Sequence, residues 1–176
     1  MLFFGFEINK ISKLQKETGK EWGFLIVWDY KNKEMRASEY IKGKEKGVWH
    51  AIDSKEIKDA AKLNDSEVVL GFFHSHPDDN KDENQFSGDP GDLRNFFVLY
   101  DGFSGLPTPE DKSILFMGVV TPNQIQVLKV DNVDNFNIIK DNYWNLDQNI
   151  RVQTRYNYNN NPRIIFTSDQ FYQKKR

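Results

Sequence analysis

The stretch VVLGFFHSHP, residues 68–77, joins an unbroken apolar run to two histidines that are separated by a single residue. The apolar run, 68–73, has no polar alternation, which predicts a strand that is covered on both faces. Side chains alternate between faces along an extended chain, so we expect His74 and His76 to project to one side and Ser75 to the other. The stretch therefore predicts two metal ligands at the end of a buried strand.

The composition of the 176-residue chain favours one soluble globular domain, residues 1–176, with 38% hydrophobic and 28% charged residues. The net charge of −2 gives no electrostatic case for a nucleic-acid partner. No apolar run approaches the roughly 20 residues of a membrane span, so we expect no membrane partner. The absence of cysteine excludes disulfides and thiolate ligands. It leaves the compartment open, because a cytoplasmic protein and an exported domain both fit.

Hydrophobic periodicity divides the rest of the chain into helices and strands. The segment that starts at Asp89 with Pro90 has the composition of a helix N-terminus. We predict helices over about 7–18, 54–63, 89–101 and, more weakly, 134–147, and strands over 22–28, 35–41, 68–73, 113–120, 125–130 and 164–166. This order predicts an α/β fold in which helices sandwich a mixed β-sheet.

A catalytic zinc ion typically has three protein ligands and an open position for water. His74 and His76 would supply two ligands, and the third should be a carboxylate from another element. Asp92, in the first turn of the helix that follows, and Asp89, at its cap, both remain candidates. A general base must lie near the metal without binding it, and Glu21 at the edge of the first strand is the candidate. Ser87 could donate a hydrogen bond to the oxygen that becomes negative.

These residues resemble the motif of the JAB/MPN (Mov34) metalloproteases, the JAMM enzymes. That motif is a strand-borne glutamate, then His-x-His-Pro, then a serine and an aspartate that opens a helix. The chain matches it at Glu21, at His74 and His76, at Ser87 and at Asp92, over roughly residues 20–130. The resemblance implies the JAB/MPN, cytidine-deaminase-like fold and a zinc-dependent peptidase or isopeptidase. It also implies that the two histidines and Asp92 bind Zn²⁺, that Glu21 is the base, and that Ser87 contacts the oxyanion.

The chain departs from the family pattern in three places. Ser87 lies five residues before Asp92, where the family usually has three, so a two-residue insertion is implied, and the loop after His76 is longer than usual. Leu93 follows Asp92, as leucine often follows the family's aspartate, which favours Asp92 over Asp89 as the ligand. Phe24 replaces a common glycine, which leaves Glu17 as a second candidate for the base.

Bacterial members of this family occur as toxin domains of large secreted effectors. The resemblance therefore also implies a deubiquitinase-like action on a ubiquitin-like conjugate, and an immunity or adaptor protein as partner. A free cytoplasmic enzyme fits the same sequence. Two alternatives have a different chemistry: a metal-free binding or scaffold module of the MPN type, and a metal that only clamps the strand to the helix.

Overall fold

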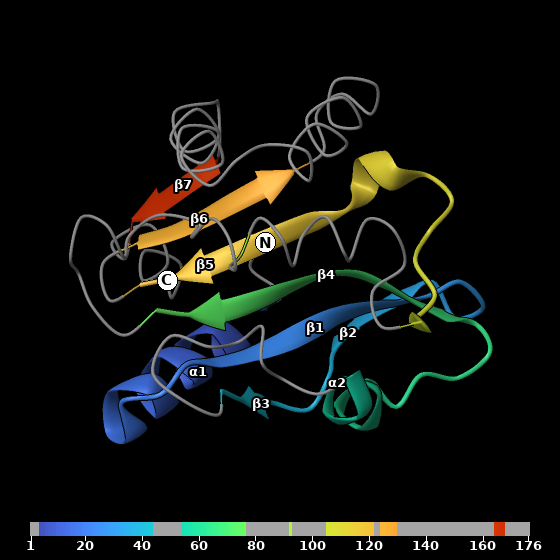
Figure 1. The fold of residues 1–176 in the computed structure, drawn as a ribbon. Coiled ribbons are helices and arrows are strands. Elements are labelled where there is room, and N and C mark those ends of the chain that lie inside the picture. Colours follow the sequence, from blue (N-terminus) through green and yellow to red (C-terminus); the bar gives the residue numbers. More distant parts are fainter. Residues whose placement is uncertain are drawn as a thin grey trace, which may run out of the picture.

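The computed structural model describes residues 4–43, 54–76, 92, 105–121, 124–129 and 164–167. In these residues a seven-stranded sheet has the strand order β2-β1-β4-β5-β6-β7, and β3 also pairs with β1 (Figure 1). The strands are β1 (Trp22–Asp29), β2 (Glu34–Ala37), β3 (Ile41–Lys42), β4 (Glu67–Ser75), β5 (Phe116–Val120), β6 (Gln124–Lys129) and β7 (Ile164–Thr167). The β4–β5 pair is parallel and the other pairs are antiparallel. The prediction of a mixed α/β fold with a mixed sheet is therefore confirmed.

Helix α1 (Gly5–Thr18) covers one face of this sheet. Ile8 and Ile11 recur at helical spacing and are buried, as the periodicity predicts. The helix ends at Gly19, whose φ of 65° is readily adopted only by glycine and whose N–H donates to the carbonyl of Gln15. The buried cluster under α1 consists of Phe4, Ile8, Ile11, Phe24, Ile26, Leu70, Phe73, Val120, Ile125 and Val127.

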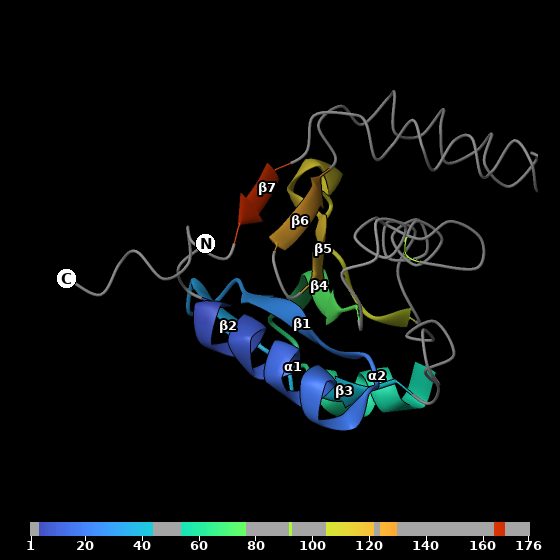
Figure 2. The ribbon, with the colours of Figure 1, turned by 90° about the vertical axis from the view of Figure 1, so that its left-hand side faces the viewer.

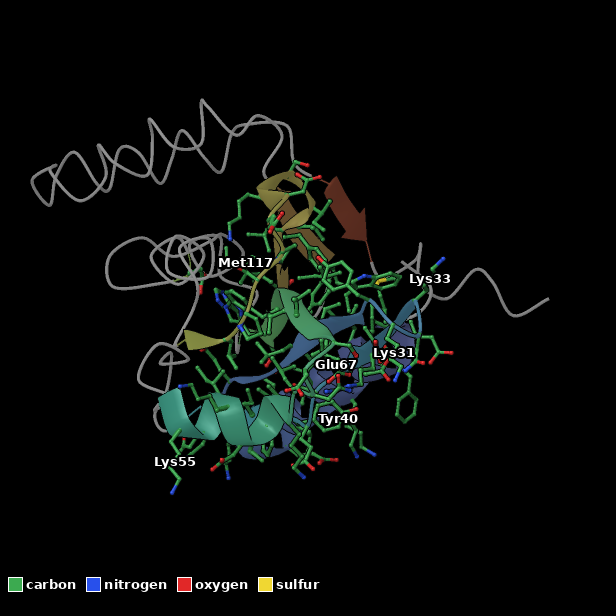
Figure 3. The ribbon with its side chains drawn as sticks, turned by 90° about the vertical axis from the view of Figure 1, so that its right-hand side faces the viewer. Lys31, Lys33, Tyr40, Lys55, Glu67 and Met117 are labelled. Atoms are coloured by element: carbon green, nitrogen blue, oxygen red, sulfur yellow. The ribbon has the colours of Figure 1, made fainter. Side chains whose placement is uncertain are left out.

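Helix α2 (Ser54–Ala61) packs on the opposite face. Val27 lies between two residues of β1 that face α1, so its side chain points to the opposite face, and Arg36 of β2 pairs with it there. Nη2 of Arg36 donates to the carbonyl of Ala61 in α2 at 2.9 Å. Figure 2 shows α1 and α2 on either side of the lower part of the sheet, and Figure 3 shows Met117 on the α2 side. Ile57 and Ala61 are buried here, and the helix agrees with the one predicted over 54–63.

Strand β4 is central to the sheet and carries a β-bulge. From Gly23↔His74 to Ile26↔Gly71 the β1–β4 ladder is regular, and then the register shifts to Val27↔Val69. Leu70 is thus the extra residue on β4. At Gly71 an added Cβ would lie 2.1 Å from the carbonyl oxygen of Phe116, so only glycine permits β4 and β5 to approach this closely.

The prediction of one strand over 35–41 is wrong, because the structure divides this segment into β2 and β3. The division occurs at Ser38, whose hydroxyl accepts a hydrogen bond from the N–H of Leu25 at 2.9 Å. That hydroxyl also donates to the carbonyl of Glu39 at 2.7 Å. The N–H of Ser38 still donates to the carbonyl of Leu25 at 2.9 Å, so the hydroxyl takes the place of the Ser38 carbonyl as the acceptor for Leu25.

The prediction of a strand from 113 to 120 is also wrong at its start. Residues Lys112–Ile114 form the 3₁₀ helix η4, and β5 begins only at Phe116. The Asp111 carboxylate accepts hydrogen bonds from the N–H and the hydroxyl of Ser113, which stabilises the turn.

The helices predicted over 89–101 and 134–147 lie outside the described residues, except that Asp92 has helical conformation. Among the described helices, none combines the length and the apolar character that crossing a membrane requires.

Candidate metal centre

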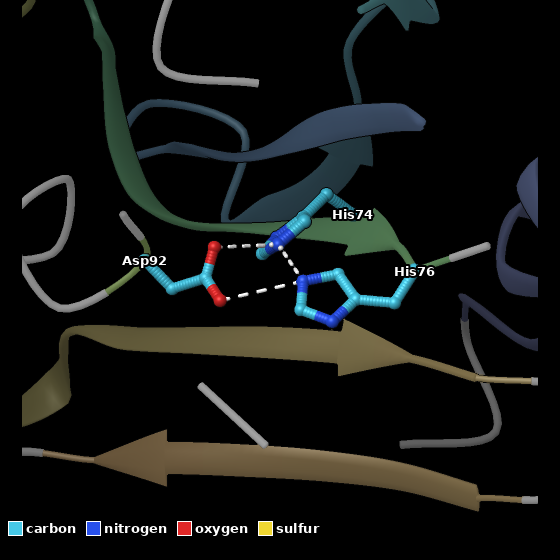
Figure 4. A group of neighbouring side chains, drawn as sticks. All are labelled: His74, His76 and Asp92. Atoms are coloured by element: carbon cyan, nitrogen blue, oxygen red, sulfur yellow. Dashed lines mark hydrogen bonds and ion pairs between the residues drawn. The ribbon is translucent and has the colours of Figure 1, made fainter. Parts of the chain in front are cut away.

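Two neighbouring strands fix the position of the histidines. His74 pairs with Gly23 of β1 on one side and with Val119 of β5 on the other. His76 follows the end of β4, and its N–H donates to the carbonyl of Val120 at 2.8 Å. Both imidazoles therefore lie on the sheet face opposite α1, and their Nε2 atoms are 3.0 Å apart (Figure 4). The prediction that the two rings share a side of the strand is confirmed.

Asp92 approaches the histidines from another part of the chain. Its Oδ1 lies 2.8 Å from Nε2 of His74, and its Oδ2 lies 3.3 Å from Nε2 of His76. One ligand atom from each of the three residues lies within 4.8 Å of the other two. Of the two acids that the sequence leaves open, Asp92 is the one that the structure brings to the histidines, whereas Asp89 lies outside the described residues.

The group is almost completely buried, with His74 0% exposed and Asp92 4% exposed. Burial raises the pKa of the Asp92 carboxyl. The charges of His74 and His76, together with their hydrogen bonds, outweigh burial and hold this pKa well below its usual range. Asp92 is thus an ionised carboxylate directed at two imidazole nitrogens, which gives the site a negatively charged ligand.

Protons alone cannot satisfy the three contacts in this group. Each Nε2 carries either one proton or one lone pair, so it serves one directed hydrogen bond. Here each Nε2 has two close partners: the ionised Asp92 and the other imidazole. When both histidines donate to Asp92, one to each carboxylate oxygen, the contact of 3.0 Å between the two Nε2 atoms brings two N–H groups together and is not a hydrogen bond. A cation between the three residues removes this conflict, because it accepts a lone pair from every ligand.

The spacing of the ligand atoms also fits a small metal ion. With metal–nitrogen distances of about 2.0–2.1 Å in a tetrahedral site, ligand atoms lie about 3.3 Å from one another. The contacts of 2.8, 3.0 and 3.3 Å come close to this value, so small outward movements suffice. Two imidazoles and a carboxylate suit zinc and also other first-row transition metals. The group could therefore hold a metal ion, and its ligand set does not by itself select zinc.

Glu21, the predicted base, lies directly before β1 and is 5% exposed. The antiparallel register of β1 and β4 ends at Gly23↔His74, so Glu21 lies two residues before the partner of the first histidine. Its backbone carbonyl accepts a hydrogen bond from the N–H of Gly43 at 2.8 Å. The Glu21 carboxylate does not belong to the group of close ligand atoms. This placement agrees with a residue that lies near a metal without binding it.

Ser87, the predicted oxyanion contact, lies outside the described residues. The sequence did not predict a bridging role for Ser75, between the two histidines. Its hydroxyl accepts a hydrogen bond from the N–H of Trp22 at 3.0 Å and donates to the carbonyl of Trp22 at 3.2 Å. The sequence signal that could have indicated this role is the serine itself, a small hydroxyl residue at the end of a buried strand.

The three candidate ligands thus come from the end of β4, the residue that follows it, and Asp92, which 15 residues separate from His76 in the sequence. A scan of the chain against protein-family models gives no match, and neither do searches of curated proteins and of solved structures.

Proposed function

We propose that the chain is a zinc-dependent metallopeptidase or isopeptidase of the JAB/MPN type, which hydrolyses a peptide or isopeptide bond. The observation that carries the proposal is the convergence of His74, His76 and Asp92 on one point, with contacts that protons alone cannot satisfy. The order of glutamate, His-x-His-Pro, serine and aspartate along the chain supports it further.

In this proposal His74, His76 and Asp92 hold the metal, and their three ligand atoms leave one tetrahedral position for water or substrate. A zinc ion at this point would polarise the scissile carbonyl and lower the pKa of a bound water to about 7. No fourth protein ligand lies in the group of close ligand atoms among the described residues. This favours a catalytic metal over a structural one, because structural zinc usually has four protein ligands.

Two residues of the chain would carry out the proton transfer and the charge stabilisation. Glu21 accepts a proton from the attacking water and passes it to the leaving amine nitrogen, a role that commonly contributes about 10²–10⁴-fold. Ser87 donates a hydrogen bond to the carbonyl oxygen as it becomes negative. Glu21 suits its role because it is buried and lies two residues before Gly23, which pairs with His74.

The proposed substrate is a protein, with a ubiquitin-like conjugate as the first candidate for a deubiquitinase-like activity. The proposed settings are the toxin domain of a bacterial effector, which would have an immunity or adaptor partner, and a free enzyme. Inhibition by a co-encoded protein would favour the first setting.

The experiment that tests the function measures metal content and hydrolysis in the same preparations. We expect about one zinc per wild-type chain and cleavage of an isopeptide-linked ubiquitin-like conjugate or a peptide library. His74→Ala and Asp92→Ala should lose both metal and activity. Asp89→Ala distinguishes the two candidate acids, and we expect this variant to retain both bound metal and activity. His50→Ala removes the remaining histidine of the chain and serves as the matched control. A wild-type chain that binds zinc and cleaves neither substrate would overturn the proposal.

A metal-free binding module of the MPN type is the second candidate function. One observation favours it: Asp92 contacts both imidazoles directly, so part of the polar group is satisfied without an ion. In that case zinc would not bind to the wild-type chain. His74→Ala would then reduce stability, because it leaves the buried carboxylate with fewer partners.

A further inference from the structure

The peptide group that joins Glu21 to Trp22 is held at both of its ends. Its carbonyl oxygen, which belongs to Glu21, accepts a hydrogen bond from the N–H of Gly43 at 2.8 Å. Its N–H, which belongs to Trp22, donates to the hydroxyl of Ser75 at 3.0 Å. The same hydroxyl donates to the carbonyl of Trp22 at 3.2 Å, so Ser75 bonds both backbone groups of one residue.

These bonds connect the strand that follows the candidate base to the strand that carries both histidines. Ser75 lies between His74 and His76 and is 1% exposed. A peptide plane that is held at both ends fixes the Cα atom of the residue before it and the direction of that residue's Cα–C bond, so the Cβ atom can move only by rotation about this bond. The position of the Glu21 Cα atom therefore depends on a hydrogen bond to Ser75, which lies between the two histidines.

We propose that Ser75 is a positioning residue that sets Glu21 at its working distance from the metal centre. This inference rests on the proposed hydrolase function, because it assigns Ser75 to the placement of that reaction's base. Ser75 and its neighbours His74 and His76 project to opposite faces, so loss of its hydroxyl leaves the ligands in place. A displacement of about 1 Å in a reacting group can lower a rate about 10²-fold, so a small shift of Glu21 is sufficient for a large effect.

Gly43 holds the same peptide group from the other side and gives an independent way to move it. A Cβ added at Gly43 would lie 3.2 Å from the carbonyl oxygen and 3.4 Å from the Cβ of Glu21. This contact is tight, so a methyl group there pushes against Glu21 without touching β4. Gly43→Ala should therefore reproduce the effect of losing the Ser75 hydroxyl.

The chain offers a matched control in Ser38. Its buried hydroxyl also accepts from a backbone N–H of β1, that of Leu25 at 2.9 Å, but it does so from the β2–β3 side, away from β4. Ser38→Ala and Ser75→Ala each remove one buried hydroxyl that accepts a hydrogen bond from a backbone N–H of β1. The two changes should therefore lower the free energy of unfolding by similar amounts. Only Ser75→Ala removes a bond between Trp22 and the histidine strand.

The test combines three measurements on the zinc-loaded full chain: amide hydrogen exchange, zinc content, and kcat and KM. For Ser75→Ala we expect faster exchange of the Trp22 amide, about one zinc per chain, an unchanged KM, and a kcat about 10–100-fold below wild type. Gly43→Ala should show the same loss of kcat. Ser75→Thr retains the hydroxyl and should restore kcat, and Ser38→Ala should speed exchange of the Leu25 amide only.

The outcomes separate this inference from the function on which it rests. An active wild-type chain with an equally active Ser75→Ala variant overturns the positioning role and leaves the hydrolase function standing. Loss of zinc from Ser75→Ala also overturns it, because Ser75 would then act on the ligands. A zinc-loaded wild-type chain without any hydrolysis overturns the proposed function itself.

Discussion

The two ends of the β1–β4 strand pair each bury polar side chains on the face opposite α1, and the two clusters are built differently. At the Asp29↔Glu67 end, Nε and Nη2 of Arg36 donate to the two carboxylate oxygens of Glu67 at 2.6 and 2.8 Å. Asn64 N–H adds a third bond to that carboxylate. At the Gly23↔His74 end, two imidazoles and Asp92 make three contacts that their protons cannot all satisfy.

This difference separates stability from function along one strand. The Arg36–Glu67 ion pair has a donor for every acceptor that it uses, so it holds β2, β4 and the end of α2 together without an additional group. The candidate metal centre brings one ligand atom from each of three residues close together, so it could hold a metal ion. We therefore expect changes at the first end to alter the free energy of unfolding, and changes at the second to alter metal binding and turnover.

The largest effect that we expect is on turnover, in Glu21→Gln. Removing the base should lower kcat about 10²–10⁴-fold, and bound zinc should be retained because Glu21 does not belong to the ligand group. Glu17→Gln is the control, because Glu17 is exposed on α1, where it forms an ion pair with Lys13 at 3.7 Å. Wild-type kcat in Glu21→Gln at saturating zinc would contradict the assignment of the base.

The next effect is on stability, in Arg36→Ala. This change leaves the Glu67 carboxylate, which is 5% exposed, without its cation. Because the Arg36 side chain is 39% exposed and solvent screens the pair, we expect a loss below that of a fully buried pair, about 2–3 kcal/mol in the free energy of unfolding, measured by urea titration. Zinc content should not change. Lys62→Ala removes the exposed ion pair with Glu39, and this control should lose only about 0.2–1 kcal/mol. Equal losses in the two variants would mean that burial does not distinguish these ion pairs.

Removing the metal should destabilise the chain by a similar or smaller amount. At free zinc 100-fold above its dissociation constant, binding stabilises the folded state by about 2.7 kcal/mol. Glu67 and His74 lie about 20 Å apart along β4, so a chelator should lower the unfolding free energies of the wild-type chain and Arg36→Ala equally. A chelator that shifts neither midpoint would indicate that no metal is bound.

The smallest effect that we expect is a dependence of stability on pH. The hydrogen bond from Arg36 lowers the pKa of Glu67 in the folded chain. Because the unfolded chain then binds more protons in acid, Glu67 stabilises the fold above its unfolded-state pKa of about 4.3, and this contribution is lost as the pH falls through the folded-state pKa. Urea midpoints between pH 6 and pH 3 should therefore fall less in Arg36→Ala than in wild type. A steeper fall in the variant would contradict this account.

Local patterns in the sequence predicted the features that depend on local spacing. Period-two alternation is enough to put His74 and His76 on one face, and the strand predicted over 22–28 agrees with β1. Hydrophobic periodicity likewise predicted the helix over 7–18, which agrees with α1.

The remaining features depend on contacts between distant parts of the chain, which spacing does not encode. Asp92 lies against the histidines although 15 residues separate it from His76 in the sequence. The Arg36–Glu67 pair joins residues 31 positions apart, and Ser38 interrupts its strand because its hydroxyl meets Leu25. Of the two errors in strand bounds, the one at the 3₁₀ helix had a local sequence signal, because Asp111 and Ser113 are two residues apart and bond to each other.

The bulge at Leu70 determines where β4 can change its length. Deleting Leu70 would bring Val69 next to Gly71, and their present partners, Val27 and Ile26, are already adjacent, so the ladder would close with every other pair retained. A deletion at Gly71, Phe72 or Phe73 could also be absorbed by the bulge, but Leu70 would then take the place of Gly71 opposite Ile26, where a Cβ would lie 2.1 Å from the carbonyl oxygen of Phe116. Homologues that are one residue shorter in this strand should therefore carry their gap at Leu70, so that a glycine stays beside β5.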